Sequence, residues 1–194
     1  MEYALAIEGA PDHIPGGTAI LLLHPSTAET DRIDTEFLRI DTDHFFVVST
    51  RTTARGVKQK LDYYNLDASK ADILDTLSVE RGLSRRSSEH IHYVSAPDDI
   101  EGIITQTREF FDNHSGKLRL SFDSLTELAY YANDEEAIHL LESIVDLLET
   151  HDAVGLFHVD REVHTEETLD RFISICDAII EVDTSGAIQT DFPG

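Results

Sequence analysis

The stretch AILLLHPSTAETDRIDTEFL, residues 19–38, decides the fold of this chain. It begins with a short apolar run of the kind found in strands buried on both faces, continues through a polar turn, and ends in a segment with helical periodicity. The same order of strand, turn and helix recurs along most of the 194 residues. This alternation predicts an α/β fold with right-handed crossovers between parallel strands.

Apolar runs mark eight expected strands, and segments with helical spacing mark five expected helices. The strands are residues 2–7, 19–24, 44–50, 90–95, 118–123, 154–159, 178–182 and 188–192, and the helices are 30–40, 53–64, 98–112, 134–150 and 165–176. Residues 69–89 form the least regular segment and read as an exposed connection. We therefore expect one domain over residues 1–194, with three layers, a mostly parallel central sheet, helices on both faces and a C-terminal β-hairpin.

The charge balance is strongly acidic, with 15 Lys and Arg against 38 Asp and Glu and a formal net charge of -23. Such a surface is typical of halophilic archaea, because salt shortens the Debye length to about 3 Å at 1 M. An ordinary acidic protein is the alternative. Direct nucleic-acid binding is not expected, since it needs a basic footprint and the basic cluster in the sequence is limited to Arg81, Arg85 and Arg86.

The sequence predicts neither a membrane protein nor a secreted one. No apolar run approaches the roughly 20 residues that span a bilayer, and residues 1–13 lack the basic start of a secretory signal. The expected location is the cytoplasm. The single cysteine, Cys176, excludes an intrachain disulfide and lies at helical spacing with apolar residues, so we expect a buried thiol.

The turn after the strand at 19–24 is where an α/β domain would hold a ligand. Aligned on the P-loop pattern G-x-x-x-x-G-K-[ST], the turn HPSTAETD puts His24 and Glu29 at the glycines, Thr30 at the lysine and Asp31 at the hydroxyl. The carboxylates would repel a polyphosphate, so nucleotide binding is not expected here. The degenerate positions are His24, Pro25, Ser26, Thr27, Ala28, Glu29, Thr30 and Asp31.

The segment KLRLSFDSLTEL resembles a Walker B strand, with apolar residues that end in Asp123 and are followed by Ser124. In a nucleotide hydrolase this aspartate supports the magnesium shell. Without a phosphate partner, Asp123 could instead cap or hydrogen-bond the adjoining loop. We favour this second role.

Together, residues 19–40, VVST at 47–50, YVSAPDDIEGI at 93–103, LSFDSLTELAYY at 120–131 and residues 154–182 resemble RecA-superfamily domains of the KaiC and GvpD type, including short haloarchaeal ones. The resemblance implies a RecA-like, P-loop-type domain. It also implies an acidic pair after the second core strand, where this chain has Arg51 and Thr52. Of the catalytic parts, the aspartate that matches Asp123 is retained.

Other functions for the residues at the strand ends, such as metal binding or hydrolysis, are less favoured by the sequence. His24, His158, Asp160 and His164 are possible metal ligands, but ten histidines make chance proximity common. A hydrolase pair of Ser26 or Ser124 with His24 or His158 lacks a G-x-S-x-G elbow. A phospho-receiver pocket lacks its lysine. We predict no metal and no cofactor.

The favoured interpretation is a non-catalytic RecA/KaiC-like module with a regulatory or assembly role in a halophilic archaeal cytoplasm. Protein partners or self-association are expected, and membranes are not. The alternative is an NTP-binding protein or ATPase with an unorthodox site around His24, Thr30 and Asp123.

Overall fold

The computed structural model describes residues 1–85 and 88–194, and Arg86 of the basic cluster lies outside the described residues. The strands are β1 (Glu2–Ala4), β2 (His13–Pro15), β3 (Ala19–His24), β4 (His44–Ser49), β5 (Ala71–Asp75), β6 (Ile91–Tyr93), β7 (Leu118–Asp123), β8 (Val154–Asp160), β9 (Ala178–Val182) and β10 (Ile188–Asp191). The helices are α1 (Asp31–Arg39), α2 (Ala54–Tyr63), α3 (Ile100–Asn113), α4 (Leu125–Tyr131), α5 (Asp134–His151) and α6 (Glu166–Ile175), with a 3-10 turn η1 (Ala68–Lys70).

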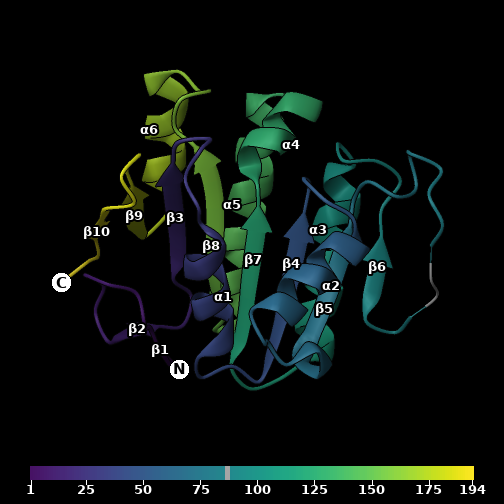
Figure 1. The fold of residues 1–194 in the computed structure, drawn as a ribbon, viewed down its shortest axis with the longest axis horizontal. Helices are drawn as coiled ribbons and strands as arrows, with labels where there is room; N and C mark the ends of the chain where they lie inside the picture. Colours follow the sequence, from purple (N-terminus) through teal and green to yellow (C-terminus); the bar gives the residue numbers. More distant parts are fainter. Residues whose placement is uncertain (86–87) are drawn as a thin grey trace.

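Eight of these strands form one sheet in the order β10-β9-β3-β8-β7-β4-β5-β6 (Figure 1). Every neighbouring pair from β9 to β6 is parallel, while β10 runs antiparallel to β9. The strand β3 lies between β8 and β9, so the chain must cross over two strands to reach β4. The predicted three-layer fold with a C-terminal hairpin is confirmed.

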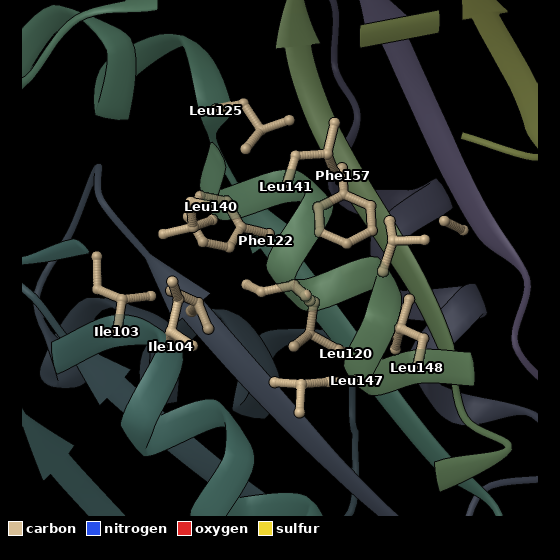
Figure 2. Close-up of a cluster of buried hydrophobic side chains, with 14 of the residues drawn as sticks. Ile103, Ile104, Leu120, Phe122, Leu125, Leu140, Leu141, Leu147, Leu148 and Phe157 are labelled. Atoms are coloured by element: carbon tan, nitrogen blue, oxygen red, sulfur yellow. The ribbon is translucent and has the colours of Figure 1, made fainter. Parts of the chain in front are cut away.

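The alternation of side chains along the central strands divides the core into two clusters, one on each face of the sheet. In β3, Leu21 and Leu23 face the cluster that α3, α4, α5 and α6 cover, whereas Ile20 and Leu22 face the cluster under α1 and α2. Figure 2 shows the first cluster, with side chains of β7, β8, α3 and α5 directed toward one another. Cys176 packs partly buried against this cluster, and burial raises the pKa of its thiol to about 12.

Several elements differ from the expectation. β5 lies inside the segment 69–89, which was predicted to be an exposed connection, yet all five of its residues are buried. Its two aspartates interrupt the apolar pattern that would have marked a strand. The expected strand at 2–7 is the shorter β1, which pairs in a separate hairpin with β2, a strand that was not expected. The short helix α4 was not expected either.

The β1–β2 hairpin covers a buried cation at the amino end of β7. Arg119 is fully buried, and its Nη2 donates to the Ala4 carbonyl at 2.7 Å. Its guanidinium carbon lies 5.3 Å from the Tyr3 ring centre and 4.9 Å from that of Phe37. Burial lowers the pKa of Arg119 to about 10, so the charge persists at neutral pH. Nε and Nη1 have no hydrogen-bond partner among the described residues.

Among the residues that the structure describes, no helix combines the length and the apolar character needed to cross a bilayer.

Replacement of Arg119 by methionine should change the free energy of unfolding by less than about 1.5 kcal/mol, or raise it, because a side chain of similar length removes two unpaired buried donors. Arg119→Ala should cost about 2–5 kcal/mol, because it leaves a cavity under the hairpin. Guanidinium denaturation of both variants measures the difference. A methionine variant as unstable as the alanine variant would show that the charge itself holds the hairpin.

Candidate functional site

The predicted site residues gather along one edge of the sheet, where β3, β8, β7 and β4 end. In open α/β sheets this edge is where ligands bind. His24 and Asp160 end β3 and β8 in register, and Asp123 ends β7 opposite Ser49 of β4. Arg51 and Thr52 follow β4 directly and are exposed. The candidate residues that the sequence analysis named at strand ends therefore lie together at one edge of the sheet.

The turn after β3 is compact and closed on itself. The Ala28 amide donates to the Pro25 carbonyl at 3.0 Å, and the Ser26 hydroxyl donates to Asp160. Thr30 is buried and does not cap α1 with its side chain. Among the other degenerate positions, Pro25 is buried, Ala28 is half-buried, and Ser26, Thr27, Glu29 and Asp31 are exposed. The first turn of α1 thus meets solvent through Asp31 and Arg32, and Glu29 is exposed just before it.

His24 is turned into the protein at the base of this turn. Its Nδ1 lies 3.0 Å from the Pro25 carbonyl oxygen, and its ring meets that of His158 edge-on with 5.8 Å between centres. Burial lowers the pKa of His24. Its Nε2 has no partner among the described residues.

A buried carboxylate that the sequence reasoning missed lies at the centre of the site. Asp34 of α1 is 1% exposed. It pairs with Lys60 of α2, whose Nζ lies at 2.6 Å, and with His158 of β8, whose Nε2 lies at 3.1 Å. It also accepts a hydrogen bond from the Ser121 hydroxyl of β7. Four elements therefore meet at one side chain.

The charges in this cluster stabilise one another. Burial alone would lower the pKa of Lys60 and raise that of Asp34, but their attraction outweighs burial, so the pKa of Lys60 is raised and that of Asp34 is lowered. Lys60 also lies 3.2 Å from Asp31. Burial would lower the pKa of His158 as well, but the carboxylates of Asp123 and Asp34 raise it.

Asp123 faces a cation and not a loop amide. Arg51 Nη1 lies 3.5 Å from its Oδ1, and His158 Nδ1 lies 4.0 Å from the same oxygen. Ser124 caps α4 by accepting from the Glu127 amide, while its own backbone is held by Thr50. Of the two roles that we favoured for Asp123, the side-chain cap of α4 is made by Ser124, while Asp123 accepts a hydrogen bond from Arg51 in the loop after β4.

The remaining candidates, Asp160 and His164, have structural partners. The Asp160 amide donates to the Thr126 hydroxyl at 2.9 Å, and that hydroxyl lies 2.9 Å from His164 Nε2. Across residues 1–85 and 88–194, no three histidine, cysteine or carboxylate groups are placed to hold a metal ion together.

A cavity of about 360 Å³ opens between α1 and α2, over β4 and β7. Its charged lining residues are Asp31, Asp34, Arg51, Lys60 and Asp123. The charged side chains that line the cavity are paired with one another, and the cavity opens to solvent.

Strand order and the position of the candidate site define a three-layer α/β domain with a mostly parallel sheet, and comparison with solved structures finds the same fold. A structure titled "Structural study of Project ID PH0250 from Pyrococcus horikoshii OT3" has a TM-score of 0.65 at 13% identity, over 92% of this chain and 88% of that one. The KaiC-like protein PH0186 of the same organism has a TM-score of 0.62 at 14% identity, over 88% and 74%.

A third structure, a prototypical ATPase from the type III secretion system of pathogenic bacteria, has a TM-score of 0.61 at 15% identity, over 95% of this chain and 58% of that one. At these identities the likeness shows the fold alone. The chain belongs to the family described as "Family of unknown function (DUF7090)", which matches residues 1–192. A comparison with curated proteins gave no match.

The raised pKa of His158 makes stability depend on pH. Its contribution should be complete below the ordinary histidine value of about 6.5 and should be lost as the pH rises through the higher folded value. His158→Gln should remove this part of the decline as the pH rises above about 6.5, whereas replacement of His139, an exposed histidine on α5, by glutamine should leave it in place. Denaturation curves across this range measure both. Equal slopes of the free energy of unfolding against pH in the two variants would show that His158 is not a charged member of this network.

Proposed function

We propose that this chain is a RecA-like domain that does not hydrolyse nucleotide and acts as a regulatory or assembly module through protein contacts. The observation that carries the proposal is that Lys60, the lysine beside the candidate phosphate position, is already paired with Asp34 and Asp31. The net charge of -23 favours the cytoplasm of a halophilic archaeon as the location of this module.

Lys60 cannot be redirected to a phosphate without a large cost. Breaking a buried ion pair by taking away one partner costs about 3–5 kcal/mol, because the other charge is left buried and uncompensated. Asp34 is a buried charge of this kind, and without Lys60 it would keep only His158 and the Ser121 hydroxyl as partners. An incoming polyphosphate would also meet Asp31 and Asp123, two further carboxylates in the lining of the same cavity.

The position of Arg51 supports the same proposal. The resemblance to KaiC-type domains implies acidic residues at Arg51 and Thr52, and the chain has a cation there. The Arg51 guanidinium lies 3.5 Å from Asp123, so it supplies positive charge where a Walker B aspartate would face a magnesium shell. Nowhere does the sequence contain G-x-x-x-x-G-K-[ST].

The alternative, a nucleotide site around His24, Thr30 and Asp123, has less support. His24 and Thr30 are 4% and 7% exposed, so they offer little surface to a ligand.

Two exposed apolar residues at the carboxyl edge of the sheet favour a protein contact. Tyr130 of α4 is 83% exposed, and Val163, just after β8, is 63% exposed. Aromatic side chains that are exposed in this way are common at protein interfaces.

Mg-ATP and Mg-GTP should leave the melting temperature unchanged in about 2 M KCl, because the cavity holds no free cation for a phosphate. A bound ligand at 100 times its dissociation constant would add about 2.7 kcal/mol to stability. Hydrolysis above the buffer blank that is abolished by Asp123→Asn would defeat the proposal.

A tagged chain purified from its native cells in about 2 M KCl should carry a second copy or a protein partner, because salt screens its acidic surface. The double variant Tyr130→Ser/Val163→Ser should lose that partner. Tyr63→Ser is the matched control, since Tyr63 is 79% exposed at the far end of α2. Equal loss in the control, or no loss in the double variant, would place the contact elsewhere.

A further inference from the structure

A second hollow, of about 690 Å³, lies beside the site described above, at the carboxyl ends of β5 and β6. The first two turns of α2 form one wall, and residues from the connection after β5 form another. Figure 1 shows this corner of the molecule at the free β6 edge of the sheet.

Two basic side chains of α2 line this hollow, Arg55 and Lys58. They are three residues apart on the helix, so their side chains project as neighbours from one face. Arg51 and Lys60 nearby are paired with carboxylates, but within residues 1–85 and 88–194 no such ion pair forms at Arg55 or Lys58. In a chain with 38 acidic residues, two unpaired cations in one hollow are a local excess of positive charge.

The carboxylate in the same lining, Asp75, offsets part of this charge but forms no ion pair with either cation, so the lining keeps an excess of positive charge. Asp75 is 1% exposed. Its Oδ1 accepts from the amides of Leu77 and Ser78 at 3.0 and 2.9 Å, and its Oδ2 accepts from the Ala54 amide at 2.8 Å and the Ser78 hydroxyl at 2.7 Å. Asp75 is therefore committed to holding the first turn of α2 against the connection after β5.

The rest of the lining is suited to an organic molecule. Ile91 and Leu83 give an apolar wall, and the hydroxyls of Thr53 and Ser84 lie in the same lining as the two cations. Pockets for small ligands have volumes of about 300–1,000 Å³ and combine an apolar wall with a few polar groups, which is the composition here.

We propose that this hollow binds a small phosphomonoester with an apolar or aromatic body. A phosphomonoester carries a charge of about -1.5 to -2 at pH 7 and three strong acceptor oxygens, so it matches two adjacent cations better than a monoanionic carboxylate does. The phosphate lies between Arg55 and Lys58, and the organic body lies against Leu83 and Ile91.

Calorimetric titration with phenyl phosphate in about 1 M KCl tests the proposal, with a phosphate-free buffer. Arg55→Gln/Lys58→Gln should weaken binding at least tenfold. Arg32→Gln/Arg108→Gln, which removes two exposed basic residues elsewhere, should bind as the wild type does. All four side chains are exposed, so these variants should fold, and circular dichroism verifies that they do.

Leu83→Ser tests the apolar wall, because Leu83 is 45% exposed. It should weaken phenyl phosphate binding several-fold and leave inorganic phosphate binding unchanged. The proposal fails if phenyl phosphate does not bind the wild type, if both double variants lose affinity equally, or if inorganic phosphate binds as tightly as phenyl phosphate. Nucleotide binding lost in Arg55→Gln/Lys58→Gln but kept in Asp123→Asn would be assigned to this hollow, and the reverse would count against the proposed function.

Discussion

The buried carboxylate of Asp34 is the constraint on which the carboxyl edge of the sheet depends. A carboxylate that is removed from water must be paired and hydrogen-bonded, because an isolated buried charge is very costly. Lys60, His158 and Ser121 meet this need from α2, β8 and β7. The same side chain therefore links α1 and α2 to the sheet, and it pairs with two of the basic side chains of the site, Lys60 and His158.

The charged side chains of this cluster are paired with one another, unlike those of a P-loop phosphate site. A phosphate loop works because backbone amides and a free lysine are ready for the ligand. Here the turn after β3 is closed by its own hydrogen bonds, and Lys60 forms an ion pair with Asp34. Arg51 likewise forms an ion pair with Asp123. The carboxyl edge of a RecA-like sheet can carry ion pairs or a nucleotide site, because the fold alone does not fix the function.

Much of the fold could be predicted because apolar strands such as AILLL carry a strong signal in sequence. β5 was missed because Asp72 and Asp75 break its apolar pattern, and only tertiary partners, including His92 for Asp72, make those carboxylates tolerable inside the sheet. The strand-end rule found His24, Asp123 and His158. It could not find Asp34 or Lys60, because both lie within helices, where a charged residue in sequence usually indicates a solvated face.

The covering of Arg119 by the N-terminal hairpin has a consequence for biosynthesis. Tyr3 donates to the Asp152 carbonyl, and Arg119 donates to the Ala4 carbonyl, so residues 3 and 4 contact residues that are made more than a hundred positions later. The hairpin must wait, unpaired with its final partners, until β7 and the end of α5 have been translated. Docking of this hairpin therefore cannot be completed before residue 152 has been made.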